Sequence, residues 1–311
     1  MANELNDQFV AQPDGLVKFL CKYPLEIDAG QFAVPPDEQA EIFAGTGKEA
    51  PERGVVATLK SKVVDKSKKG LDFQVIQNKA TPVWCDFPMT TSGPSEGIVF
   101  PKLYRASSGN FVKLFYLPWD ADKRHALDLT GNANYFMTAS MHGCRFEVHK
   151  KPGDVYHVSH SNVQPKDGLD AQGMIPYLRM ADKKRGTREL KFGKDRYYAD
   201  ATKLIGSAQQ RMIHWGVAAG DVLEAEPETY KANVLGTVTA PGQWSFYYQL
   251  WGWVKVRLHE RVKKKKWLGL KTEYVHNTNE AYLKVVFLVQ QIHPVVTDIY
   301  KLHKTAKDPY S

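Results

Sequence analysis

Within residues 134–162, a cysteine and a histidine are spaced so that they could act together in catalysis. The run Lys151-Pro152-Gly153 predicts a tight turn, because proline presets φ and glycine accepts the positive φ that a hairpin loop demands. Antiparallel pairing across that turn places Cys144 opposite His160. Directly opposed side chains have Cβ atoms roughly 4.5 to 5.5 Å apart. The pattern therefore predicts a thiol nucleophile beside its base.

The alternation of residue types supports this hairpin. One face would carry the apolar residues together with the thiol and the imidazole: Cys144, Phe146, Val148, Tyr156, Val158 and His160. The other face would point to solvent and carry Arg145, Glu147, His157 and Ser159. A cysteine on an apolar strand face is often only a small buried side chain. A register slip of one residue would also separate the two groups onto opposite faces.

The same residues resemble a known catalytic core. Thr138, then Gly143-Cys144, a charged strand, a turn and a second strand ending His160-Ser161-Asn162 are similar to the cytotoxic-necrotizing-factor and Burkholderia-lethal-factor superfamily. These bacterial toxins and effectors deamidate glutamine, and the chemotaxis deamidase CheD shares their catalytic layout. The resemblance covers about thirty of 311 residues. The usual Leu-Ser-Gly-Cys is replaced by Met141-His142-Gly143-Cys144.

The resemblance implies a reaction and a role for each residue. Cys144 would attack the side-chain carboxamide of a protein glutamine, His160 would act as general base and acid, and Thr138 would orient the histidine. The turn around Gly143 and His142 would supply backbone N–H donors to the oxyanion, since glycine allows close approach. His157 is the alternative base. No cofactor and no metal is expected.

Other functions use parts of the same pattern. The pair Cys144 and His160 would serve another cysteine hydrolase, such as a protease, or an acyltransferase. A metal site is disfavoured, because no second cysteine stands at ligand spacing. Short matches to ADP-ribosylating toxins occur at Arg105, at Thr138-Ala139-Ser140 and at Glu224-Ala225-Glu226. A non-enzymatic β-rich binding protein is the remaining alternative, with the aromatic run from Trp244 to Trp253 as its recognition surface.

Composition and charge indicate which partners and which cellular compartment to expect. The net charge is +8, and lysines cluster at Lys263-Lys264-Lys265-Lys266. No nucleic-acid-binding module surrounds this cluster, so no specific nucleic-acid partner is expected. We expect a protein substrate in a host or competitor cell instead. Neither a transmembrane segment nor a signal peptide is recognisable. Three cysteines, odd in number and far apart, favour a reducing compartment. We expect the protein in the cytoplasm of its producer, from which a specialised system could secrete it as a virulence effector.

Periodicity predicts a strand-dominated α+β fold, a sandwich of mainly antiparallel sheets with flanking helices. Residues 1–95 form an N-terminal α+β segment that targets the protein or packs on the core, and residues 96–311 form the β-rich catalytic domain; one single domain is the alternative. Helices are expected at residues 16–20, 39–43 and 200–215. Residues 281–292 are uniformly apolar and fit either a buried strand or a helix.

Overall fold

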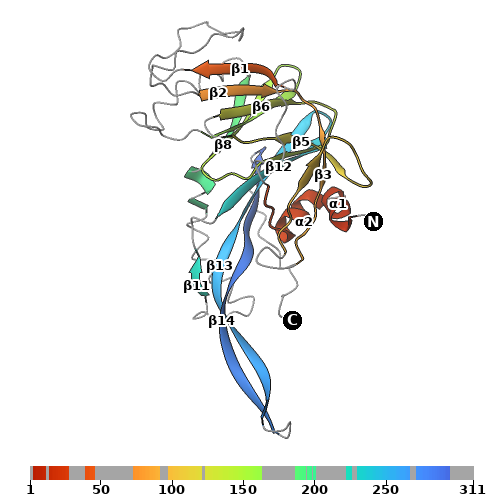
Figure 1. Ribbon diagram of the computed structural model, residues 1–311. Helices are drawn as coiled ribbons and strands as arrows, with labels where there is room; N and C mark the ends of the chain where they lie inside the picture. Colours follow the sequence, from red (N-terminus) through yellow and green to blue (C-terminus); the bar gives the residue numbers. More distant parts are fainter. Residues whose placement is uncertain are drawn as a thin grey trace.

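A computed structural model describes residues 3–11, 14–27, 39–45, 73–91, 97–120, 123–162, 186–193, 195–197, 199–200, 222–225, 230–266 and 271–294. Within these ranges strands dominate and form two mixed, mostly antiparallel sheets, as the sequence predicted. Two short helices, α1 (Glu4–Val10) and α2 (Gly15–Lys22), precede them. Neither helix is long and apolar enough to cross a membrane. Figure 1 shows the arrangement.

The first sheet has the strand order β1-β2-β6-β9-β8-β10. Its strands are β1 (Gln39–Gly45), β2 (Phe73–Asn78), β6 (Lys123–Leu129), β8 (Arg145–Lys151), β9 (Val155–Ser161) and β10 (Thr187–Gly193). All neighbours are antiparallel except β2 and β6.

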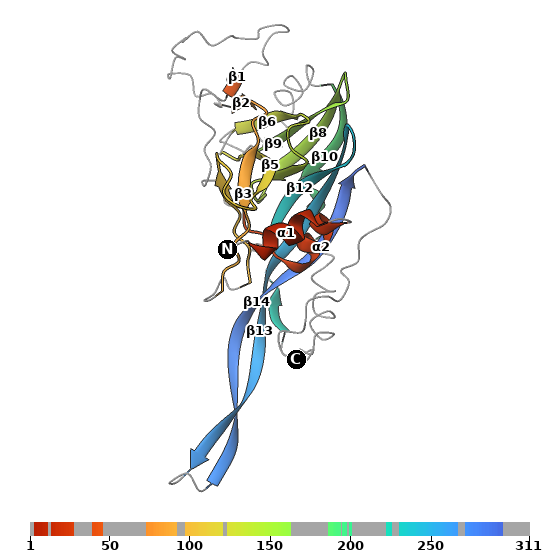
Figure 2. The same ribbon diagram turned by 90° about the vertical axis from the view of Figure 1, so that its right-hand side faces the viewer.

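The second sheet has the order β11-β13-β12-β7-β5-β3-β4, and β14 pairs with β13. Its strands are β3 (Val83–Asp86), β4 (Lys102–Tyr104), β5 (Val112–Leu117), β7 (Tyr135–Thr138), β11 (Val222–Ala225), β12 (Lys231–Ala240), β13 (Gln243–Lys266) and β14 (Lys271–His293). Only β5 and β7 run parallel. Strands β13 and β14 extend far beyond the other elements (Figure 2).

Apolar side chains fill two layers, one on each side of the second sheet. Alternate residues of β7, β12 and β13 point toward the first sheet, where Phe136 and Phe246 meet Phe146 of β8. The intervening residues, such as Trp251, pack under α1 and α2. Because strand side chains alternate between faces, a sheet covered on both sides needs apolar residues at nearly every position. That requirement explains the aromatic run in β13.

The central hairpin exists, but its predicted register is wrong by two residues. Strand β8 ends at Lys151, which pairs with Val155, and His160 lies opposite Phe146 rather than Cys144. The turn is therefore Pro152-Gly153-Asp154. Gly153 and Asp154 both take positive φ, 78° and 58°, because aspartate tolerates the left-handed region better than most residues. An offset of two preserves the alternation, so Phe146 and Val148 still share a face with Val158 and His160.

The opposite face of this sheet is buried, whereas the sequence predicted a solvent face. Arg124 on β6 donates from Nη2 to Glu147 Oε2 and to Ser159 Oγ, both at 2.7 Å, and all three side chains are buried. Burial alone would raise the pKa of Glu147, but neighbouring His149 and the Arg124 guanidinium lower that pKa to about 2. The alternating polar residues therefore form a buried layer held by ion pairs. A sequence pattern alone does not distinguish such a layer from a solvent-exposed face.

Two of the expected helices can be compared with the structure. Helix α2 covers the predicted residues 16–20. The predicted helix at residues 39–43 is wrong, because these residues form β1 and pair antiparallel with β2, with Ile42 opposite Ile76. Residues 281–292 belong to β14. The helix expected at residues 200–215 lies, apart from Asp200, outside the described residues, and the proposed division at residue 95 stays a prediction.

The buried ion pair gives a stability prediction. We expect Glu147→Gln to lower the free energy of unfolding by about 3–5 kcal/mol, because it leaves the buried Arg124 charge uncompensated. Asp154→Asn is the matched control: its ion pair with Lys150, 2.9 Å long, is exposed, so its loss should cost less than about 1 kcal/mol. Urea denaturation of both variants measures the difference. Equal losses would show that the Arg124–Glu147 pair does not stabilise the sheet.

Candidate active site

Cys144 lies between the two sheets, immediately before β8. The turn that delivers it contains Gly143, whose φ of 93° suits glycine. The Cys144 side chain is only 2% exposed and belongs to the apolar layer between the sheets. The indole of Trp119, on the connection from β5 to β6, donates from Nε1 to the Cys144 Sγ at 2.9 Å. The thiol therefore has a hydrogen-bond donor of its own.

Thr138 and His160 come from opposite sheets and meet in the same layer. The Thr138 Oγ1 lies 2.6 Å from His160 Nδ1 and 3.3 Å from the carbonyl oxygen of Ala139. A threonine hydroxyl has one proton to donate. If that proton goes to the Ala139 carbonyl, His160 must carry its own proton on Nδ1, and its Nε2 is left with a free lone pair. Within the described part of the chain His160 Nε2 is buried without a hydrogen-bond partner.

The thiol and the imidazole share a side of the first sheet, but no hydrogen bond between them is found among the described residues. His160 lies opposite Phe146 in the ladder. Extending that ladder by one residue makes Cys144 a diagonal neighbour of His160, a relation that corresponds to roughly 7–8 Å. The Sγ accepts a hydrogen bond from the Trp119 indole instead. Proton transfer between Cys144 and His160 thus requires the two side chains to approach.

Burial keeps both groups neutral. It raises the pKa of the Cys144 thiol to about 11, although hydrogen bonds from the His142 backbone and the Trp119 indole act in the opposite direction. Burial, with the charge of neighbouring His125, lowers the pKa of His160 to about 3. The resting site therefore holds a thiol and an imidazole, rather than a thiolate and an imidazolium. Such a pair can react only if the histidine removes the proton during the attack.

Two of the candidate oxyanion donors are occupied. The backbone N–H of Gly143 donates to the hydroxyl of Tyr197 at 2.5 Å. The N–H of Met141 donates to the Ala232 carbonyl on β12. His142 is exposed, and its ring nitrogen Nδ1 lies 3.5 Å from the carbonyl oxygen of Tyr230. The Tyr197 hydroxyl stands where an oxyanion bonded to Gly143 would lie, so a substrate would have to displace it.

His157, the alternative base, points the other way. It lies three residues from His160 on β9, and therefore on the opposite face of the sheet. Its Nδ1 is 2.6 Å from Asp128 Oδ1, and Lys151 donates to the same carboxylate at 2.8 Å. This placement favours His160 over His157 as the partner of Cys144.

Sequence reasoning missed the groups that surround the pair. His125 lies opposite His160 on β6, and its Nε2 is 3.0 Å from Asp120 Oδ2. Trp119 and Asp120 are adjacent in the chain, so one short connection contacts both the Cys144 thiol and the His125 ring. Tyr197 lies far away in sequence. The only available signal was the Trp119-Asp120 pair directly after a buried strand, and nothing in it pointed to Cys144.

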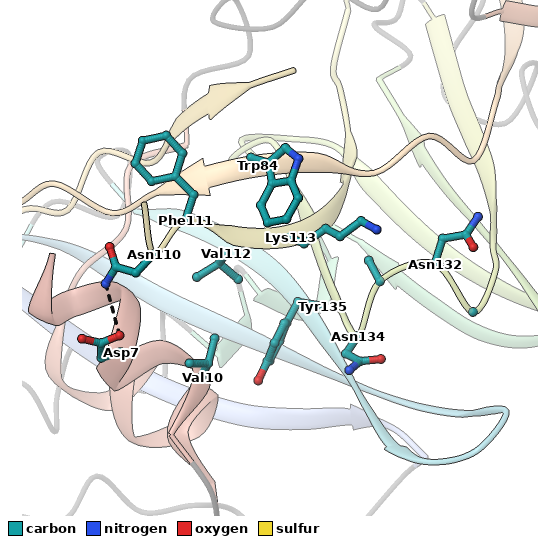
Figure 3. A pocket seen from close by; sticks show the side chains of 12 residues that line it. Asp7, Val10, Trp84, Asn110, Phe111, Val112, Lys113, Asn132, Asn134 and Tyr135 are labelled. Carbon is teal, nitrogen blue, oxygen red and sulfur yellow. Dashed lines mark hydrogen bonds between the residues drawn. The ribbon is translucent and has the colours of Figure 1, made fainter. Parts of the chain in front are cut away.

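A surface pocket of about 500 Å³ lies apart from these residues. It opens beside α1, where Trp84, Asn110, Lys113 and Tyr135 line it (Figure 3). Cys144, His160 and Thr138 do not contribute to its walls. Among the described residues, no group of three or more histidine, cysteine, aspartate or glutamate side chains could hold a metal ion.

The sequence matches no protein-family model and no curated protein.

The neutral state of His160 predicts a pH dependence of stability. An unfolded histidine has a pKa of about 6.5, and the folded value is about 3. Between these values the unfolded state binds a proton that the native state does not, so stability falls as the pH drops through this window. We expect His160→Gln to flatten that fall by up to about 1.4 kcal/mol per pH unit. Urea denaturation between about pH 4.5 and 6.5 tests this expectation.

The matched control removes an exposed histidine, His142→Gln. Like His160→Gln, it removes one histidine, but it should leave the dependence of the unfolding free energy on pH as in the wild type. If the His142 and His160 variants flatten the curve alike, the buried neutral histidine is not the cause.

The contact between Trp119 and the thiol predicts a change in cysteine reactivity. We expect Trp119→Ala to accelerate alkylation of Cys144 by iodoacetamide roughly tenfold or more, because exposing the sulfur brings its pKa back toward about 8.5. Burial is the larger influence on this pKa, so its relief outweighs the loss of the indole hydrogen bond. Peptide mapping after timed alkylation reports the rate. Trp84→Ala, in the separate pocket, is the control and should not change it. An unchanged rate in Trp119→Ala would mean that other side chains alone bury the sulfur.

Proposed function

We propose that the chain is a toxin- or effector-like cysteine hydrolase that converts a glutamine of a target protein to glutamate. One observation carries the proposal: the hydrogen bond of 2.6 Å between Thr138 and His160, made inside the sandwich on the side of the sheet where Cys144 lies. A threonine that holds a histidine by Nδ1 fixes the ring and leaves Nε2 for proton transfer. The family resemblance assigns this positioning role to Thr138.

The reaction proceeds in two halves. Nε2 of His160 takes the proton of the Cys144 thiol while the sulfur bonds to the carbonyl carbon of the glutamine side chain. The carbon–nitrogen bond then breaks, and the imidazolium gives its proton to the leaving nitrogen, which departs as ammonia. In the second half His160 takes a proton from water, whose oxygen attacks the thioester. Glutamate is released, and the proton returns to the sulfur.

Two side chains must move for a glutamine to enter. Trp119 bonds the sulfur and has to give up that contact, and the Tyr197 hydroxyl has to leave the Gly143 amide so that the oxyanion can take its place. Both are aromatic side chains that cover polar atoms of the site. The resting structure therefore corresponds to a closed site, and binding of the protein substrate would supply the energy that opens it.

The test uses isotopically labelled cell extract incubated with the wild type, Cys144→Ser and Thr138→Val. We expect glutamine-to-glutamate conversion at one or a few sites with the wild type, and no conversion with Cys144→Ser. Thr138→Val should retain activity reduced by roughly 10²-fold, because valine keeps the shape but frees the imidazole. Peptide mass spectrometry of the extract detects the conversion.

The control variant is His157→Gln, which alters the other histidine of β9. It should keep wild-type conversion if His160 is the base. Conversion that survives in Cys144→Ser, or that disappears equally with His157→Gln and His160→Gln when both proteins are folded, would refute the proposed mechanism. Cleavage of peptide bonds instead of glutamine conversion would indicate the protease alternative with the same two residues.

One observation favours a second candidate, a non-enzymatic β-rich binding protein. Cys144 is 2% exposed, and burial raises the pKa of its thiol to about 11, values that also suit a purely structural cysteine. In that case Cys144→Ala would leave every function intact. Comparing the wild type with Cys144→Ala in the extract experiment separates the two candidates, since only the enzyme converts glutamine and only the enzyme loses an activity with this change.

A further inference from the structure

The connection from β5 to β6 carries the indole that covers the thiol. Strand β5 ends at Leu117, and β6 begins at Lys123. Between them, Trp119 donates from Nε1 to the Cys144 Sγ at 2.9 Å. Asp120 is the next residue in the chain. A contact that fixes Asp120 therefore also restricts where the indole can lie.

The Asp120 carboxylate is bonded to the start of β6. Its Oδ2 accepts a hydrogen bond from the Lys123 ammonium at 3.0 Å, and the same oxygen lies 3.0 Å from Nε2 of His125. Burial would raise the pKa of Asp120, but the hydrogen bonds with Lys123 and His125 hold that pKa below its ordinary value. The carboxylate is therefore charged at neutral pH, and it anchors the connection to two residues of β6.

The ring proton of His125 is placed to serve this anchor. The side-chain Nδ2 of Asn78 lies 3.5 Å from His125 Nδ1, and an amide nitrogen can only donate. His125 Nδ1 is then the acceptor, so the proton of the neutral imidazole lies on Nε2 and is donated to Asp120 Oδ2. Burial lowers the pKa of His125 despite the bond to Asp120, which keeps the ring neutral.

The exposure of these side chains limits the strength of the anchor. The Asp120 side chain is 48% exposed and that of Lys123 is 34% exposed, and water screens an ion pair of this kind. The His125 side chain is only 4% exposed, so its hydrogen bond to the carboxylate is better shielded. Loss of the anchor should release the connection and leave the sandwich folded.

We propose that Asp120 is a positioning residue of the candidate active site and that it keeps the Cys144 thiol covered. Its bonds to His125 and Lys123 hold the connection in place, and the connection holds the Trp119 indole on the sulfur. The inference rests on the proposed function, because the same indole has to leave the sulfur before a glutamine can enter. Asp120 takes no part in bond making; it sets how often the thiol becomes accessible.

A second cluster of the same composition lies on the other face of the sheet and supplies a matched control. His157 Nδ1 lies 2.6 Å from Asp128 Oδ1, and the Lys151 ammonium donates to this carboxylate at 2.8 Å. Like Asp120, Asp128 is partly exposed, but it lies within β6 rather than on the connection that carries Trp119. A change that only loosened the first sheet should therefore have the same effect at either aspartate.

The experiment measures the alkylation rate of Cys144 by iodoacetamide in the full chain, followed by peptide mapping. We expect Asp120→Ala to raise the rate roughly tenfold, the effect of losing one hydrogen bond to a charged group. Asp120→Asn keeps an oxygen that can accept the His125 N–H, so it should restore most of the slow rate. Asp128→Ala should alkylate at the wild-type rate. Urea denaturation of each variant shows that it is folded.

A double variant tests whether Asp120 acts through Trp119. In the Trp119→Ala background no indole remains to be held, so adding Asp120→Ala should change the rate less than about twofold. A further tenfold rise in that background would overturn the proposal, as would an equal rise with Asp128→Ala or an unchanged rate in Asp120→Ala alone.

Alkylation requires no glutamine substrate, so this test is separate from that of the proposed function. A chain that converts no glutamine but shows the coupling between Asp120 and Trp119 would refute the deamidase and retain Asp120 as the residue that keeps the thiol covered. A chain that converts glutamine without the coupling would refute only the role of Asp120.

Discussion

Burial of both faces of the sheet around β6, β9 and β8 is the constraint on which the rest of the structure depends. Side chains on one face complete the apolar layer between the sheets, and side chains on the other must be polar groups that satisfy one another. Arg124 bonds Glu147 and Ser159 there, and it fixes three neighbouring strands at one register. In that register His160 and Thr138 meet across the sandwich at hydrogen-bond distance.

The same burial decides the chemistry available to Cys144. A sulfur in an apolar layer does not ionise readily, and a histidine buried in the same layer rests as the neutral imidazole. Reactivity would have to be created by the arriving substrate, which would displace the Trp119 indole. This arrangement would protect a thiol from oxidation in the resting protein and restrict its use to the moment of binding.

Local residue preferences predicted that the central hairpin exists and where it turns. They did not predict the register of its two strands or the distant side chains that pack against it. Pro152 and Gly153 correctly indicated a turn between β8 and β9, but the pattern could not show that Asp154 also turns, and so the pairing was misplaced by two residues. The segment at residues 39–43 has ordinary helical residues, yet it pairs with β2. Trp119 and Tyr197 reach the site from distant parts of the chain, and contacts of that kind leave no periodic signal.

Beyond Val256, where the pairing with β11 ends, β13 and β14 continue as a two-stranded ribbon that has an open edge on each side among the described residues. Open strand edges invite pairing with a second copy of the same chain, and natural proteins counter this hazard with lysines on the edge. The sequence of this ribbon includes Lys263-Lys264-Lys265-Lys266, and like charges oppose the pairing of two copies. The ribbon thus combines the geometry of a template for strand pairing with a sequence that works against self-association.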